Sequence, residues 1–297
     1  MARLVFLGTP DAAVRPLETL VATGHDVALV VTRPDKRRGR GAELVPSPVK
    51  AAATALGLAV TDDLTEAVGV GAELGVVVAY GRIIPTAVLD RLPMVNLHFS
   101  MLPRWRGAAP VERALLEGDG ETGVCLMAVE AGLDTGAVYA EEATAIGDDE
   151  TADGLRARLV DIGCRLLAEH LPAGPVDLPT PHEQSGEPTY AEKLRPEEFH
   201  LDWGRPALDL DRVVRLGRAW TTFRGRRLRV LRATPVPAGD RPAAGDGVPG
   251  VLSEGVVDCG SGSGLRLVEV QPEGKQPMAA DAWLRGVRPE PGERLGG

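Results

Sequence analysis

The sequence predicts an α/β protein in which a mostly parallel sheet is followed by a small antiparallel barrel. The chain opens with an apolar run, Leu4–Leu7, then a Gly-Thr-Pro turn, helical spacing of apolar residues to Val21, and a second apolar run, Val27–Val31. This order indicates a βαβ unit and therefore a parallel sheet. Beyond Thr221, short alternating segments are separated by Gly and Pro. The two halves are typical of a Rossmann-like domain and an OB-like barrel.

Further patterns divide the chain. The uninterrupted run Val76–Ala79 suits a strand covered on both faces, and Met94–Leu97 is another predicted strand. Thr151 precedes a long helical pattern that ends near Leu167 and closes the first domain. Many Pro and polar residues follow, as in a linker. We expect a catalytic domain over residues 1–175, a linker over 176–200 and a barrel that binds nucleic acid over 201–297.

The composition is that of a globular protein. Hydrophobic residues make up 44% of the 297 positions and charged residues 25%. No apolar run approaches the roughly 18 residues that span a bilayer, and we expect no signal peptide. The three cysteines, Cys125, Cys164 and Cys259, are too widely spaced for a disulfide set or a paired metal motif. A cytoplasmic protein without a membrane partner or a metal is the simplest interpretation.

Two basic stretches stand out against a net charge of -9. The first runs from Arg33 to Arg40, and the second runs from Arg212 to Arg232 and contains no acidic residue. A charge run is often only a solvated surface. A flexible cationic loop can also follow phosphates and become ordered on binding. Both interpretations stay open on charge alone.

Asn96 and His98 stand at the end of a predicted parallel strand, where ligands bind in open sheets. Because they are two residues apart, a strand points both to one face. Asn is a hydrogen-bond donor and His can exchange a proton near neutral pH, so the pair can stabilise an oxyanion during attack on an acyl carbonyl. Asp134, between Gly132 and Gly136, could orient the imidazole. On spacing alone, a strand end and an ordinary Asp turn are an equal alternative.

The segment Asn96–Pro110 closely resembles the signature of the folate-dependent formyltransferases, and the resemblance covers nearly the whole chain. It continues through an ordered set of motifs, which are Phe6–Asp11, Pro46–Lys50, Val78–Gly81, Gly132–Gly136, Thr189–Leu194, Asp202–Trp203 and Gln271–Lys275. Any one of these motifs is weak, whereas the ordered set is highly specific. The resemblance is greatest to the members that act on the methionine of initiator tRNA.

This resemblance implies roles for particular residues. The catalytic Asn, His and Asp of the family fall on Asn96, His98 and Asp134, and no metal is needed. The segment that contacts tetrahydrofolate falls on Ser100, Met101, Leu102 and Pro103, and Tyr80 with Gly81 is expected to line the same pocket. The implied donor is 10-formyltetrahydrofolate, and the implied acceptor is the free amine of methionyl initiator tRNA. We expect the enzyme to be a monomer.

The basic stretches gain a role from the same resemblance. In the family, a basic loop enters the acceptor stem of the tRNA, and Arg40 matches its key arginine. The residues expected to bind tRNA are Arg33, Lys36, Arg37, Arg38 and Arg40, with the second stretch as an electrostatic rail on the barrel. The turn Gly8-Thr9-Pro10 is not a dinucleotide-binding fingerprint, since it lacks Gly-x-Gly-x-x-Gly, so a tight turn that lets the helix pack is expected.

Two departures and two alternatives remain at this stage. Phe99 and Met101 replace the residues more common in the family, and we expect altered pocket walls with intact chemistry. The segment Arg215–Trp220 is shorter than the aromatic run usual there. One alternative function is a formyltransferase for a nucleotide-linked amino sugar, which would share Asn96, His98 and Asp134. The other is a tRNA-binding protein without catalysis, against which the complete catalytic set argues.

Overall fold

The computed structural model of the protein describes residues 2–38, 43–171, 178–240 and 247–296, and the chain folds into two compact units. The first unit comprises residues 1–113, 120–146 and 154–193, and the second comprises residues 114–119, 147–153 and 194–297. The segment expected to be a linker therefore contributes residues to both units. Its part up to Lys193 belongs to the first unit, and Leu194 begins the long C-terminal part of the second.

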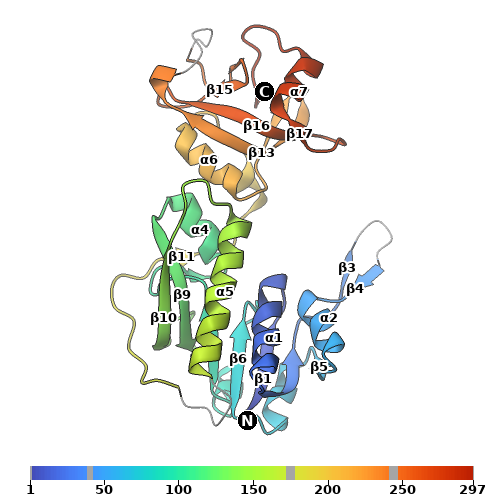
Figure 1. Ribbon diagram of the computed structural model, residues 1–297, viewed down its shortest axis with the longest axis vertical. Helices are drawn as coiled ribbons and strands as arrows, with labels where there is room; N and C mark the ends of the chain where they lie inside the picture. The colour runs from blue at the N-terminus through green and yellow to red at the C-terminus, as the bar shows by residue number, and fades with distance from the viewer. Residues whose placement is uncertain (1, 39–42, 172–177, 241–246, 297) are drawn as a thin grey trace. The chain divides into compact units, whose positions relative to one another are not determined.

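A seven-stranded sheet in the order β10-β9-β7-β6-β1-β2-β5 forms the centre of the first unit (Figure 1). Five neighbouring strands run parallel, while β9 runs antiparallel to both β7 and β10. This confirms the mostly parallel sheet expected from the sequence. The strands are β1 (Arg3–Gly8), β2 (Asp26–Val31), β5 (Val60–Thr61), β6 (Leu74–Val78), β7 (Met94–His98), β9 (Glu121–Ala128) and β10 (Val138–Ala145).

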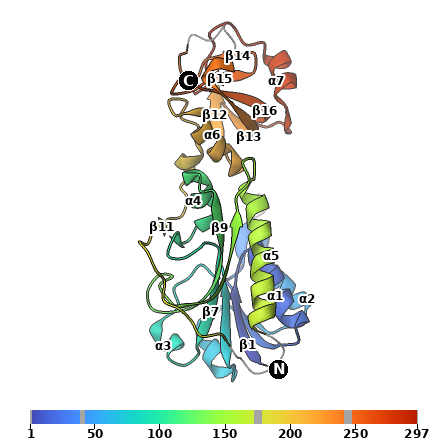
Figure 2. The same cartoon turned by 60° about the vertical axis from the view of Figure 1, so that its left-hand side comes forward.

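Helices cover both faces of this sheet. Helices α1 (Val14–Ala22) and α5 (Ala152–His170) lie on one face, and α3 (Thr86–Leu89) lies on the other (Figure 2). The 3-10 helix η2 (Leu64–Gly69) joins α3 over a core cluster that includes Leu7 and Val77. Because both faces are covered, the parallel strands are continuously apolar, and every residue of β6 is buried.

The turn after β1 has the packing role expected for it. A Cβ atom at Gly8 would lie 2.9 Å from the Cβ of Ala13 and 3.1 Å from the carbonyl oxygen of Val78. Glycine is therefore required for the close approach of the 3-10 helix η1 (Asp11–Ala13), which leads into α1, to the sheet. No phosphate-binding role is needed to explain this residue.

Short elements surround the carboxyl end of the sheet. Strands β3 (Lys36–Arg38) and β4 (Glu43–Val45) form an antiparallel hairpin that projects from the first unit (Figure 1). It leads into α2 (Pro48–Ala55), whose first turn is capped because the Ser47 hydroxyl accepts a hydrogen bond from the Lys50 amide at 3.0 Å. Strand β8 (Arg106–Gly107), followed by α4 (Pro110–Glu117), pairs in parallel with β11 (Tyr190–Ala191).

The second unit is built on an antiparallel sheet in the order β12-β13-β16-β15-β14, with β17 paired to β16. Its strands are β12 (Trp220–Phe223), β13 (Arg226–Val236), β14 (Leu252–Ser253), β15 (Val256–Asp258), β16 (Gly264–Pro272) and β17 (Met278–Ala279). The C-terminal segment links both edges, since Leu295 bridges to Phe223 of β12 and Arg294 bridges to Val251 beside β14. This closure gives the small barrel that the sequence predicts.

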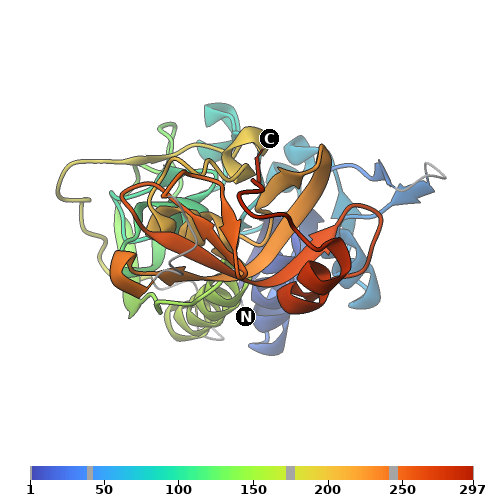
Figure 3. The ribbon, with the colours of Figure 1, turned by 90° about the horizontal axis from the view of Figure 1, so that it is seen from above.

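Helices complete the second unit. Helix α6 (Ala207–Arg215) precedes β12, and α7 (Ala280–Val287) lies beside the long strands (Figure 3). The 3-10 helices η3 (Pro196–Phe199) and η4 (Ala238–Asp240) are the remaining elements described. Trp283 of α7 packs edge-on against Phe223 with ring centroids 5.1 Å apart. The short segment after Arg215 connects the end of α6 directly to β12, which begins at Trp220.

Two further expectations concern the cysteines and membranes. Cys125 and Cys259 are buried and Cys164 is partly buried, and all three are free thiols. This agrees with the expected absence of a disulfide set. Within the residues that the structure describes, no helix is long and apolar enough to span a bilayer.

The packing predicts where the first unit is most sensitive to mutation. Leu7 of β1 is fully buried in the cluster beneath η2 and α3, and we expect Leu7→Ala to lower stability by about 2–5 kcal/mol because it leaves a cavity. Leu208→Ala is the control, since that side chain is 55% exposed. Denaturant unfolding measures both. Equal stability of the two variants would contradict this account of the core.

Candidate active site

Strand β7 presents Asn96 and His98 on one face of the sheet. Asn96 pairs with Met127 of β9 and His98 pairs with Cys125, so both lie on the face that carries Met94. The intervening Leu97 points to the opposite face, where Gly163 of α5 comes so close that a Cβ there would lie 3.0 Å from the leucine side chain. Packing of α5 therefore fixes the orientation of β7 and turns both polar side chains the other way.

The imidazole of His98 is buried and oriented by the backbone. Its Nε2 lies 2.9 Å from the carbonyl oxygen of Trp105, and its Nδ1 lies 3.7 Å from Oδ2 of Asp134. Because a carbonyl oxygen only accepts, Nε2 must carry a hydrogen. The nitrogen that can gain or lose a proton is consequently Nδ1, which faces the carboxylate.

Asp134 occupies a constrained turn. Its φ of 49° lies in the left-handed region, which is uncommon for a residue other than glycine and often marks a functional position. The amide of Gly107 donates a hydrogen bond to Oδ2 at 2.8 Å. Two residues later, a Cβ at Gly136 would lie 2.1 Å from the Ala128 carbonyl oxygen, so the loop can close only with glycine there.

The backbone of residues 105–107, which includes β8, holds the side chains of His98 and Asp134 at once. The Trp105 carbonyl binds His98, and the Gly107 amide binds Asp134. This segment is itself held by Thr189, whose hydroxyl accepts from the Trp105 amide at 2.9 Å and whose carbonyl accepts from the Arg106 amide at 2.9 Å. The backbone of β8 is thus a common support for the imidazole and the carboxylate.

Gln184 adds a second support that sequence reasoning missed. Its Nε2 donates to the carbonyl oxygens of Asp134 and Gly136, at 2.8 and 2.9 Å. Its Oε1 accepts from Nε and Nη2 of Arg106, at 3.0 and 2.6 Å. Gln184 lies in the segment expected to be a linker, and no local pattern marks it, whereas Thr189 does fall within a motif of the resemblance.

The four residues expected to contact folate differ in burial: two are buried and two are partly exposed. Ser100 is fully buried and its hydroxyl donates to the Arg104 carbonyl at 2.6 Å, so it shapes the turn after β7. Leu102 packs in a cluster with Cys125 and Met127, while Met101 and Pro103 are partly exposed. The structure therefore places Asp134 beside His98, with Asn96 on the same face of β7, but directs Ser100 and Leu102 into the protein.

Of the two residues expected to line the folate pocket after β6, Tyr80 is buried and Gly81 is exposed. The Tyr80 ring is buried in the core cluster with Leu7, and its hydroxyl has no hydrogen-bond partner among the described residues. Its carbonyl accepts from the Thr9 hydroxyl at 3.1 Å. Gly81 is exposed and has a φ of 74°. A ligand could therefore meet the backbone and Gly81 here more readily than the Tyr80 ring.

Apolar side chains are exposed on the two loops beside β7. Ile83, on the loop after β6, is 88% exposed, and Leu133, beside Asp134, is 59% exposed. The loops lie on the same side of the sheet, since Val129 packs against the cluster that contains Tyr80 and Ile84. Exposed apolar groups near a few fixed polar groups are typical of a small-molecule site.

Cys125 is the other reactive side chain near His98. Burial raises the pKa of its thiol to about 12, so the thiol stays neutral at pH 7 and is not a nucleophile. Among the described residues, no group of three or more His, Cys, Asp or Glu side chains could hold a metal ion. At this end of β7, His98 and Asp134 are a pair that could exchange a proton, and Asn96 is a neighbouring hydrogen-bonding group.

The basic stretches take two forms. Arg33 follows β2 and is partly buried, whereas Lys36 and Arg37 are exposed on β3. Arg38 ends that strand, and Arg40 lies outside the described residues. In the second unit, exposed arginines stack on aromatic rings, with Arg227 4.4 Å above Trp220 and Arg218 4.3 Å above Phe199.

Comparison with known proteins identifies the family. Residues 2–171 match the family described as Formyl transferase, and residues 193–288 match the family described as Formyl transferase, C-terminal domain. A methionyl-tRNA formyltransferase from Dinoroseobacter shibae is 44% identical, over 96% of this chain and 97% of that protein. The chain belongs to the methionyl-tRNA formyltransferase family. A second member, from Paracoccus denitrificans, is 43% identical over 96% of this chain and 97% of its own.

Solved structures support the fold assigned to this family. An N-formyltransferase from Helicobacter canadensis, in complex with folinic acid and dTDP-3-aminofucose, superposes with a TM-score of 0.68 at 16% identity, over 92% of this chain and all of that one. HypX from Aquifex aeolicus, in complex with tetrahydrofolic acid, gives 0.63 at 18% identity, over 95% of this chain and 47% of that one. At these identities the likeness establishes a shared fold.

The support from Gln184 predicts a defect confined to catalysis. We expect Gln184→Leu to lower kcat for formyl transfer on the order of tenfold, because the Asp134 loop loses two hydrogen bonds of about 1 kcal/mol each. KM should stay nearly unchanged. Glu183→Leu is the matched control, since Glu183 is the exposed neighbour. The assignment is wrong if both variants show the same kcat.

Proposed function

We propose that this protein transfers the formyl group of 10-formyltetrahydrofolate to the free amino group of methionyl initiator tRNA, which prepares that tRNA for translation initiation. The observation that carries the proposal is the arrangement of Asn96, His98 and Asp134 in a chain 44% identical to a methionyl-tRNA formyltransferase over nearly its full length. We further propose that it acts as a cytoplasmic monomer.

In the proposed reaction the methionyl amine attacks the formyl carbon, the new C–N bond forms, and the bond from that carbon to the folate nitrogen breaks. Negative charge develops on the formyl oxygen as the amine attacks. The Asn96 side chain is half-buried and makes no hydrogen bond to other described residues, so its amide is available to donate to that oxygen. When His98 is protonated, its Nδ1–H is the second donor.

Asp134 provides for the protons in this reaction. At 3.7 Å its carboxylate balances the charge of the His98 imidazolium and can accept the proton that the attacking amine must lose. The departing folate nitrogen takes up a proton in return. The Gly107 amide keeps Oδ2 in place during this exchange, because it donates to the same oxygen at 2.8 Å. The catalytic set acts without a covalent intermediate on the protein.

The residues near β7 fit a flat, partly apolar donor such as a pterin. The exposed side chains of Ile83 and Leu133 can supply apolar contacts, and the open Gly81 permits close approach of a ring to the backbone. The sequence-based roles of Met101 and Pro103, which are partly exposed, remain part of the proposal. Ser100, Leu102 and the Tyr80 ring are buried, so they support this surface without being exposed on it.

Charge favours tRNA as the acceptor over a nucleotide-linked amino sugar. Lys36 and Arg37 are exposed on the β3–β4 hairpin, and we propose that they contact phosphates together with Arg33, Arg38 and Arg40. The stacked arginines of the second unit, such as Arg227 on Trp220, offer both cations and aromatic surface to a nucleic acid. A single sugar nucleotide needs neither so many cations nor so wide a surface.

A direct assay decides between the acceptors. Purified protein with 10-formyltetrahydrofolate is offered either methionyl initiator tRNA or an amino-sugar nucleotide, and formation of the formamide is measured. We expect product only with the tRNA. Absence of tRNA formylation, with or without reaction of the sugar, would overturn the proposed function.

Removal of the catalytic groups tests the mechanism. We expect His98→Ala to lower kcat on the order of 100-fold to 1000-fold, because a donor to the developing oxyanion is lost. Asp134→Asn should also be impaired, whereas Glu130→Gln, which removes an exposed carboxylate from the same loop, should not. Circular dichroism controls for folding. Near-normal turnover by a folded His98→Ala protein would refute the assignment.

A further inference from the structure

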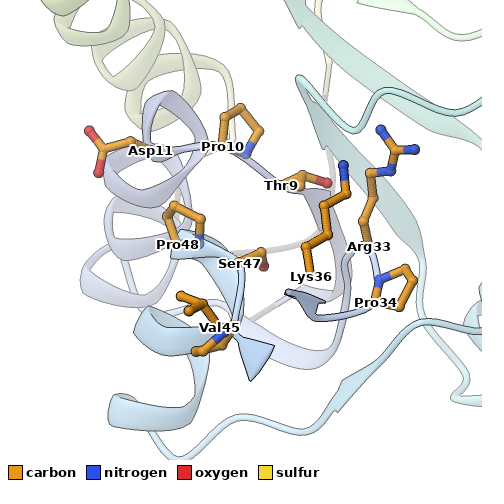
Figure 4. A pocket seen from close by; sticks show the side chains of 10 residues that line it. Thr9, Pro10, Asp11, Arg33, Pro34, Lys36, Val45, Ser47 and Pro48 are labelled. Carbon is orange, nitrogen blue, oxygen red and sulfur yellow. The ribbon is translucent and has the colours of Figure 1, made fainter. Parts of the chain in front are cut away.

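A cavity of about 290 Å³ lies at the carboxyl end of the parallel sheet, beside strands β1 and β2. Its walls come from the turn after β1 (Thr9–Asp11), the start of the loop after β2, and the residues that lead from β4 into α2 (Val45–Pro48). Figure 4 shows Pro10, Pro34, Pro48 and Val45 around it, with the side chains of Lys36 and Arg33 near Thr9. The wall is therefore mainly apolar and the rim is cationic.

Hydrogen bonds fix the three walls relative to one another. The hydroxyl groups of Thr32 and Ser47 lie 2.8 Å apart and are both buried, and the Lys50 ammonium pairs with Asp35 at 2.8 Å. The Val49 amide lies 3.5 Å from the Thr9 carbonyl oxygen. These links make the cavity part of the folded unit rather than a gap between independent loops.

The cavity is lined by two cations, Arg33 and Lys36, and one carboxylate, Asp11, so its net charge favours an anion. Asp35 is neutralised by Lys50, while Arg33 and Lys36 have no ion pair or hydrogen bond from their side chains to any residue that the structure describes. Arg33 is partly buried, and its Nη1 lies 3.8 Å from where a Cβ of Gly81 would be. Its guanidinium thus reaches from the end of β2 toward the loop after β6. An unpaired, partly buried arginine is suited to a bidentate phosphate contact.

The cavity lies where this sheet is suited to hold a ligand. The chain order reverses between β1 and β6, where ligands of open α/β sheets bind, and the cavity lies next to that point, beside β1 and β2. The same edge carries His98, because β7 runs parallel to β6, β1 and β2. With strands spaced about 4.8 Å apart, the ends of β1 and β2 lie roughly 10–14 Å from the end of β7.

We infer that this cavity binds a nucleoside monophosphate unit, namely the terminal nucleotide of the acceptor strand, whose ribose carries the methionyl group. The base and sugar lie against the proline-rich wall, and the 5′-phosphate binds Arg33 and Lys36. A methionyl ester on that ribose then extends along the sheet edge toward His98. This inference rests on the proposed function and gives Arg33 and Lys36 a role distinct from that of the exposed Arg37.

The test compares adenosine 5′-monophosphate with adenosine in NMR titrations of the full-length protein. We expect the monophosphate to bind more tightly and to perturb the amides of Thr9 and Val45. Arg33→Gln should weaken binding of the monophosphate about 10-fold to 100-fold, because a charge-assisted contact is lost, and should leave adenosine binding unchanged. Arg91→Gln is the matched charge control, since Arg91 is exposed at the opposite edge, just before β7.

Two outcomes overturn the inference. One is that adenosine 5′-monophosphate fails to perturb the cavity residues, and the other is that Arg33→Gln and Arg91→Gln affect its binding equally. These failures can be distinguished from failure of the proposed function, which shows itself as absence of tRNA formylation by the unaltered protein. If that protein formylates tRNA but does not bind the monophosphate in the cavity, only the assignment of the cavity is wrong.

Discussion

The backbone of Trp105 and Gly107 holds His98 and Asp134 in one arrangement, and the rest of the first unit serves to keep that backbone in place. A carbonyl oxygen cannot change its protonation state, so His98 always has Nε2–H directed at Trp105 and Nδ1 free for chemistry. The support is distant in sequence. Thr189 and Gln184 reach it from residues that follow the last helix of the domain. The segment expected to be a linker therefore supports the backbone that holds His98 and Asp134.

The parallel arrangement of the sheet places side chains from different strands along one edge. The carboxyl ends of its five parallel strands share one edge, so His98 at the end of β7 and the cationic rim at β2 face the same side. Asn96 and His98 need only one strand to be aligned, because α5 packs against Leu97 and fixes the rotation of β7. Recognition residues can then lie on hairpins and loops that vary without disturbing the chemistry.

Sequence patterns predicted the features that depend on local periodicity. The first βαβ unit, the long helix after Thr151 and the shared face of Asn96 and His98 follow from residue spacing, and the structure contains each of them. Contacts between distant segments could not be predicted in this way. Nothing near Gln184 indicates that it meets Asp134 fifty residues earlier, and the burial of Tyr80 depends on how η2 and α3 cover the sheet. Position after a strand predicts proximity to a site, but not which way a side chain points.

The cations of the first basic stretch also differ in how firmly the surrounding structure fixes their side chains. Arg37 is exposed on β3 and can contribute attraction to a polyanion without a fixed geometry. Arg33 lies in the same basic run but is partly buried, directed toward Gly81, and placed beside a cavity whose walls are hydrogen-bonded together. Phosphate contacts position a nucleic acid rather than read its sequence. In the proposed arrangement, the partly buried Arg33 therefore sets where the acceptor end stops, while exposed cations set how strongly the remainder is attracted.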